Sequence, residues 1–153
     1  MRWLELKIPP LLIVLGFGLA MYGASWSLPV TNFEMPGRPY VSLAFAILGV
    51  ATVASGVIAF RSKKTTVDPR FPDKASSVVT IGIYRITRNP MYLGMLFLLT
   101  AWALFLANFI VIILLAGFVV YMTLFQIKPE ERILRSKFGA EYEEFLSRVR
   151  RWI

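Results

Sequence analysis

Two short clusters of polar and aromatic residues hold the side chains that could do chemistry in this chain. The first is Gly82–Gly94, which contains two arginines, two tyrosines and an Asn-Pro-Met-Tyr turn. The second is Glu130–Tyr142, which opens on a pair of adjacent glutamates. Carboxylates, guanidinium groups and phenols bind charged ligands and pass protons. These two clusters are therefore the candidate functional segments.

The residue types that are missing exclude several classes of chemistry. The chain has no histidine and no cysteine among its 153 residues. Without histidine there is no imidazole base, no imidazole metal ligand and no Ser-His-Asp triad. Without cysteine there is no disulfide, no thiolate metal site and no thiol nucleophile. The sequence therefore predicts no metal site.

Four apolar runs without a charged residue must position the two clusters. Apolar types make up 57% of the chain, more than is usual in soluble domains. A helix crosses a bilayer core with about 20 apolar residues, and these runs lack the alternation of barrel strands. The sequence predicts a single all-α domain over 1–153, an integral membrane protein with four transmembrane helices. The predicted spans are residues 8–28, 40–60, 90–106 and 109–127.

The basic residues predict how the chain sits in the membrane. If it crosses four times, 16 of the 17 lysines and arginines fall on one side, and Arg38 falls on the other. The positive-inside rule then places both termini and the long 61–90 loop in the cytoplasm. We expect the plasma (inner) membrane, with the first run as an uncleaved span. The lipid bilayer accounts for the net charge of +8, so no nucleic-acid partner is expected.

The tail from Lys128 to Ile153 is predicted to be an amphipathic helix at the membrane interface. Its apolar residues recur at steps of three and four, which gives one apolar face. These residues are Leu134, Phe138, Tyr142, Phe145 and Val149. Gly139 is expected to divide the helix in two. The basic residues and Trp152 at the end suit a lipid headgroup zone.

The short connection Ala107-Asn108 predicts that the two clusters meet. A two-residue link makes the last two spans antiparallel neighbours, so the start of the third lies beside the end of the fourth. The segments 61–90 and 128–153 should therefore face one pocket. The spans themselves hold no aspartate, glutamate, lysine or arginine, which disfavours a proton pump or ion-coupled transporter.

Each cluster also has an ordinary structural interpretation. Arginine and tyrosine just before a span, such as Arg88 and Tyr92, are common interfacial anchors. Asn89-Pro90 is a common helix start, and a Glu-Glu pair in a first turn complements the helix dipole. Spacing alone leaves both interpretations open.

The pattern G-x-Y-x-x-x-R-N-P-M-Y-x-G, followed about 35 residues later by E-E-x-x-L-x-x-x-F-G-x-x-Y, adds a resemblance. It resembles the isoprenylcysteine carboxyl methyltransferase and phospholipid methyltransferase superfamily, over about residues 61–153. The resemblance implies an integral membrane enzyme that uses S-adenosyl-L-methionine, bound in a pocket that faces the cytosol.

The resemblance also implies roles for individual residues. Cofactor-binding positions are matched by Tyr84, Asn89, Pro90, Met91, Tyr92 and Glu130, and by a loop of Ser76, Ser77, Val78 and Val79. Arg88 and Glu131 are implied as catalytic residues near the reacting end, or as residues that hold the pocket together. Gln126 takes the position where the prenylcysteine enzymes carry a substrate-contacting arginine, and Asn89 stands where they have histidine.

These two departures leave the methyl acceptor open. It is expected to be a small or lipidic carboxylate, amine or thiol that enters from the bilayer. The departures also keep open a non-catalytic membrane protein or assembly factor of the same fold. A third alternative is an electrostatic membrane scaffold, which rests on basic residues such as Lys63 and Lys64. The sequence predicts no particular oligomeric state.

Overall fold

The computed structural model describes residues 4–62 and 76–153, and this part of the chain is helical without a strand. Its helices are α1 (Pro10–Ser27), α2 (Arg38–Ser62), α3 (Pro90–Leu106), α4 (Phe109–Met122), α5 (Lys128–Phe138) and α6 (Ala140–Arg148). The 3₁₀ turns are η2 (Pro29–Thr31) and η4 (Gly82–Arg85), and the π-helical turn η5 (Thr123–Ile127) joins α4 to α5. The all-helical prediction is confirmed, and each predicted span has its helix.

Three helices are long and apolar enough to cross a bilayer by length and composition. They are α1, α2 and the continuous helix Phe109–Phe138, which runs through α4, η5 and α5. The fourth, α3, is apolar but only 17 residues long, at the lower limit for a span. In the continuous helix the first charged residue is Lys128. The charge-free part of this helix therefore ends at Ile127, and α5 lies beyond it.

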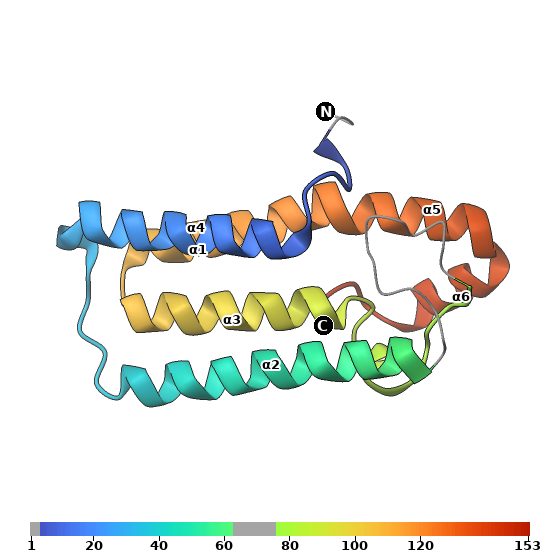
Figure 1. Cartoon of the computed structure of the whole chain (residues 1–153), viewed down its shortest axis with the longest axis horizontal. Helices are drawn as coiled ribbons and strands as arrows, with labels where there is room; N and C mark the ends of the chain where they lie inside the picture. Colours follow the sequence, from blue (N-terminus) through green and yellow to red (C-terminus); the bar gives the residue numbers. More distant parts are fainter. Residues whose placement is uncertain (1–3, 63–75) are drawn as a thin grey trace.

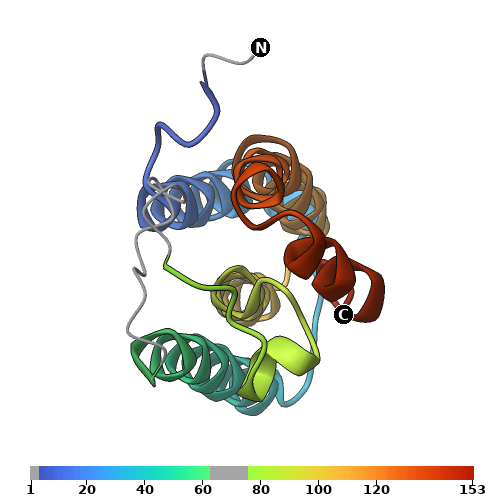
Figure 2. The same cartoon turned by 90° about the vertical axis from the view of Figure 1, so that its right-hand side faces the viewer.

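The long helices lie side by side with their axes nearly aligned. Helix α3 packs against α1, α2 and α4, and α1 packs against α4. The end view shows α3 between the α1–α4 pair and α2 (Figure 2). The N-terminal segment, the segment that precedes α3, α5 and α6 all lie at one end of the bundle (Figure 1). Both candidate clusters are thus at the same end, as four crossings require.

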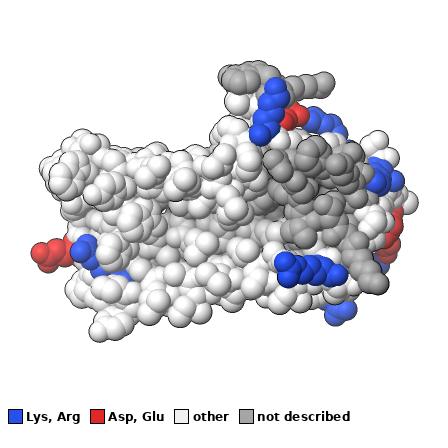
Figure 3. All heavy atoms as spheres, viewed as in Figure 1, with Lys and Arg blue, Asp and Glu red and all other residues white. Residues whose placement is uncertain are grey.

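Charged residues gather at the two ends of the molecule. On the face in Figure 3, lysine, arginine and acidic side chains lie at either end of the long axis, and the middle is uncharged. Such an uncharged band fits the hydrocarbon core of a bilayer, where charges are costly. Which end faces the cytoplasm stays a prediction.

Helices α2 and α3 approach each other closely at a pair of glycines. A Cβ on Gly94 would lie 2.7 Å from the carbonyl oxygen of Gly49 and 2.9 Å from the backbone nitrogen of Val53. Further along α2, a Cβ on Gly56 would lie 3.2 Å from Cγ of Pro90, the first residue of α3. Small residues let membrane helices pack backbone to backbone. This contact seats the start of α3, and with it the first cluster, on α2.

The C-terminal helices use their apolar face inside the protein. Gly139 has a φ of 53° and separates α5 from α6, so the predicted division is confirmed. The five apolar residues predicted to share a face all lie in or against one core. That core also contains Ala59 from α2 and Val79 and Tyr84 from the segment before α3. A position at the membrane surface stays a prediction for these helices.

Candidate functional site

The structure brings the two predicted clusters together. The hydroxyl of Tyr92, in the first turn of α3, donates a hydrogen bond to Oε1 of Glu130 in α5. Nη1 of Arg88 lies 3.3 Å from Oε1 of Glu131. Residues separated by about 40 positions in the sequence therefore form one site at the end of the bundle.

Glu130 is a carboxyl without a paired cation among the described residues. It is half-buried, and its one hydrogen-bond partner there is the Tyr92 hydroxyl. Burial raises the pKa of Glu130 to about 8, the hydrogen bond from Tyr92 lowers it, and the charge of Glu131 raises it. A carboxyl in this state gains from any cation that a ligand brings, because the cation stabilises its ionised form.

Glu131, in contrast, is fully engaged by two arginines. Arg151 forks onto it, with Nε 3.1 Å from Oε1 and Nη2 2.7 Å from Oε2. Arg88 takes the same Oε1, and only 10% of the Glu131 side chain is exposed. Forked guanidinium–carboxylate pairs fix geometry as well as charge. Of the two roles implied for Arg88 and Glu131, this geometry favours holding the pocket together.

The C-terminal residues take part in the site, which the sequence did not indicate. The side-chain amide of Asn89 donates to the carbonyl of Arg151 at 2.9 Å. Thr87, which is fully buried, donates to the same carbonyl at 3.4 Å. Trp152 packs against the core of the bundle, and its indole donates to Thr123 Oγ1 at 3.2 Å. The expected headgroup anchors at the C-terminus are therefore partners of the first cluster and of η5.

Two buried tyrosines close the site on the side of α6. Tyr84, in η4, is 4% exposed and its ring lies 5.3 Å from that of Phe60, centroid to centroid. Burial and then the charge of Glu130 hold the pKa of Tyr84 far above its usual value. Burial and then Glu131 do the same for the pKa of Tyr142. Both phenols keep their protons at neutral pH, so neither is suited to act as a base.

The other predicted cofactor positions lie around this centre. Val79 is buried in the core with Tyr84, and Val78 packs against it. Ser76 is exposed, whereas Ser77 Oγ is buried and has no hydrogen-bond partner among the described residues. Pro90 and Met91 pack toward Gly56 of α2. Lys63 and Lys64 of the scaffold alternative lie outside the described residues.

Gln126 is fully buried in η5 and ties the N-terminal segment to the bundle. Its side-chain nitrogen donates to the carbonyl of Ile8 at 2.9 Å. Because a carbonyl only accepts, this contact fixes which end of the amide is which. Its Oε1 is left without a hydrogen-bond partner in the described part of the chain. A substrate role for this oxygen stays a prediction.

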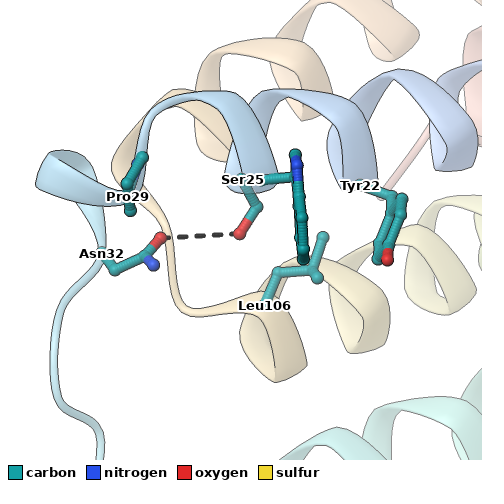
Figure 4. A pocket seen from close by; sticks show the side chains of 6 residues that line it. Tyr22, Ser25, Pro29, Asn32 and Leu106 are labelled. Carbon is teal, nitrogen blue, oxygen red and sulfur yellow. Dashed lines mark hydrogen bonds between the residues drawn. The ribbon is translucent and has the colours of Figure 1, made fainter.

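A separate pocket of about 360 Å³ lies at the other end of the bundle. Its walls come from α1, η2, the residue after η2 and the end of α3 (Figure 4). The lining residues are Tyr22, Ser25, Trp26, Pro29, Asn32 and Leu106. This pocket lies at the end of α3, whereas the two clusters lie at its start. The pocket is therefore not part of the candidate site. Within residues 4–62 and 76–153, no group of three or more acidic, histidine or cysteine residues is placed to hold a metal ion.

Comparison with known proteins identifies the family. The phospholipid methyltransferase family matches residues 38–141, from α2 into the start of α6. An uncharacterized protein of Haemophilus influenzae is 43% identical over 63 residues, which are 41% of this chain and all of that protein. No solved structure matches the chain. Because the family match spans more than half of the chain, the chain belongs to the phospholipid methyltransferase family.

Proposed function

We propose that this protein is a membrane methyltransferase that uses S-adenosyl-L-methionine and holds it between segment 76–92 and the start of α5. The family supports methyl transfer at a membrane. The observation that carries the cofactor assignment is Glu130, a carboxyl beside the Tyr92 hydroxyl that has no paired cation among the described residues. Such a group is poorly satisfied until a cationic ligand arrives.

The residues at the site fit this cofactor. Its ammonium would pair with Glu130, since charge-assisted hydrogen bonds are the strong ones. Its carboxylate would take donors from Arg88 and Ser77, whose Nε and Oγ are buried without a partner in the described structure. Tyr84 and Tyr92 offer aromatic faces for the adenine or the sulfonium. Each charged part of the ligand thus has a matching group on the protein.

The chemistry requires positioning more than proton transfer. When bound, the cofactor would supply a methyl group for in-line transfer from its sulfonium sulfur to a nucleophile, with the thioether as the leaving group. The residues of the chain orient the reactants and exclude water, which are the main sources of rate in such a step. Glu131 is held by two arginines and Tyr84 keeps its proton. An amine or thiol acceptor would therefore lose its proton to water, and a carboxylate acceptor would need no base.

The proposal includes a cytosolic site and an acceptor that comes from the bilayer. The end of the bundle with both clusters carries most of the basic residues, and the positive-inside rule places such an end in the cytoplasm. The segment before α1, as far as the structure describes it, and the C-terminus lie at that end (Figure 1). The acceptor is a small or lipidic carboxylate, amine or thiol, and the membrane is the inner membrane.

Titration with S-adenosylhomocysteine tests the proposal directly. This product keeps the ammonium and carboxylate that Glu130 and Arg88 would bind. Calorimetry on the detergent-purified protein should show saturable binding to one site per chain. If protein shown to be folded binds no ligand at about 1 mM, which corresponds to a binding free energy of only about −4 kcal/mol, the proposal is contradicted. Binding without methyl transfer to phospholipids, prenylated thiols or small thiols would favour the non-catalytic alternative.

The affinity for S-adenosylhomocysteine is expected to rise with pH up to about pH 8. Because burial raises the pKa of Glu130 to about 8, the carboxyl is mostly protonated below that pH. Binding of an ammonium then releases one proton, so the affinity falls about tenfold for each pH unit below the pKa. Titrations across this range measure the slope, and Glu130→Gln should flatten it. A wild-type affinity that does not change with pH would contradict the assignment.

A further inference from the structure

We propose that the C-terminal segment Arg150–Trp152 is a strap that fixes the geometry of the binding site, with Arg151 as a positioning residue. The segment lies beyond the residues 38–141 that match the family. It follows α6 and is not helical itself. Figure 1 shows the C-terminus next to the start of α3. The proposal rests on the proposed function, since the geometry it fixes is that of the cofactor site.

The backbone of the strap is held by the residues that precede α3. The carbonyl of Arg150 accepts from the backbone nitrogen of Arg88 at 3.0 Å. The carbonyl of Arg151 accepts from the side-chain amide of Asn89 at 2.9 Å. Thr87 and Arg150 form a parallel bridge. The strap therefore runs beside Thr87–Asn89 in the manner of a short strand. It thereby fixes the position of the Arg88 backbone, from which the side chain extends to Glu131.

The side chain of Arg151 connects this strap to α5. Its fork on Glu131 occupies both carboxylate oxygens, and Arg88 shares one of them. Glu131 follows Glu130 in the first turn of α5. Arg88 and Arg151 together thus fix the orientation of the first turn of α5 relative to α3. Residues that contact a binding residue without contacting the ligand hold that residue in the geometry that binding requires.

The end of the strap is anchored in the bundle. Trp152 packs against the core formed by α1, α3 and α4. Its indole nitrogen lies 3.2 Å from Oγ1 of Thr123, the first residue of η5. The strap therefore spans from the start of α3 to the π-helical turn, and its position depends on both.

The decisive variant is Arg151→Gln, compared with Arg151→Lys and with Arg148→Gln as a matched control. Arg148 is three residues away and its ion pair with Glu144 is exposed. Arg151→Gln should weaken S-adenosylhomocysteine binding by at least about tenfold, because a forked charged hydrogen bond is lost. Arg151→Lys should recover part of this affinity, and Arg148→Gln should bind as the wild type does.

The pH profile separates positioning from simple stabilisation. Loss of the Arg151 charge leaves Glu131 less compensated, so the pH at which binding is half-maximal should move upward. The ionisable groups that act on Glu130 or face it come from η4, α3, α5, α6 and the segment before α3. They are Tyr84, Tyr92, Glu131 and Tyr142, together with Arg88, which acts through its ion pair with Glu131. A role in stability alone would lower the melting temperature without moving this midpoint.

Hydrogen exchange of residues 85–92 provides a measurement that needs no cofactor. Release of the strap frees the backbone N–H of Arg88, so exchange there should be faster in Arg151→Gln. If the wild type itself binds no S-adenosylhomocysteine, the proposed function fails and this exchange alone decides for or against the strap. Unchanged exchange, or unchanged affinity together with an unchanged pH midpoint, would overturn the proposal. If Arg151→Gln does not fold, Arg151→Lys and Trp152→Phe take its place with the same criteria.

Discussion

Replacement of Glu130 by glutamine should weaken S-adenosylhomocysteine binding by about 30-fold or more, since truncating one partner of a buried charge pair costs at least about 2 kcal/mol. Glutamine keeps the size of the side chain and still accepts the hydrogen bond from Tyr92. The variant therefore removes the charge and leaves the packing. Because Glu130 has no paired cation among the described residues, loss of its charge should weaken only the interaction with the ligand ammonium. Calorimetry at about pH 8, where about half of the carboxyl is ionised, gives a larger contrast than calorimetry at lower pH.

The matched control for this variant is Glu141→Gln. Glu141 is exposed in the first turn of α6, so the change removes one negative charge from the same end of the molecule. Its affinity should equal that of the wild type. If Glu130→Gln also binds as the wild type does, Glu130 is not part of the cofactor site. A circular dichroism spectrum of each variant establishes that the helices are intact.

The second large effect is expected from Gly94→Ala at the contact between α2 and α3. The added methyl group would lie 2.7 Å from the Gly49 carbonyl oxygen, a backbone atom that has no other rotamer to adopt. The two helices must therefore separate, at a cost of about 1–3 kcal/mol. The midpoint of thermal unfolding in detergent should fall accordingly. Ligand affinity should fall as well, because α3 carries Tyr92 into the site.

Gly16→Ala provides the comparison for the glycine contact. Gly16 lies in α1, where a new Cβ would meet nothing within 4 Å. Alanine is favoured over glycine in a helix by up to about 1 kcal/mol, so this variant should be as stable as the wild type or more so. Equal unfolding midpoints for Gly94→Ala and Gly16→Ala would show that the close approach of α2 and α3 carries little energy.

The features that could be predicted from the sequence are those with a local cause. Charge-free runs set the helices to within a few residues, and Pro90 starts α3 because its ring suits a first turn. The short Ala107-Asn108 turn is also local, with Asn108 capping α4 through the backbone nitrogen of Ile110. From the number of crossings, it follows that the two clusters share one end of the bundle. The particular hydrogen bond between Tyr92 and Glu130 was not predicted, because it depends on how α3 and α5 are turned toward each other.

The features that could not be predicted depend on how distant segments meet. An arginine near a C-terminus looks the same whether it anchors a headgroup or forks onto Glu131, as Arg151 does. Gln126 matched a substrate position by its place in the sequence, yet its amide donates to the Ile8 carbonyl. The contact between Gly49 and Gly94 depends on where two helices cross, which neither glycine reveals alone.

The length of the continuous helix Phe109–Phe138 indicates how far Glu130 lies from the apolar part of the protein. At 1.5 Å per residue its 30 residues are about 45 Å long, and a hydrocarbon core is about 30 Å thick. Glu130 follows the last apolar residue, Ile127, by three positions, or about 5 Å of rise. An acceptor with its reactive group at the same shallow level could meet the site while its chains stay among the lipids. Under the proposed function, an acceptor that carries its reactive group far out on a long headgroup would place that group beyond the site, so the depth of the site would select among acceptors.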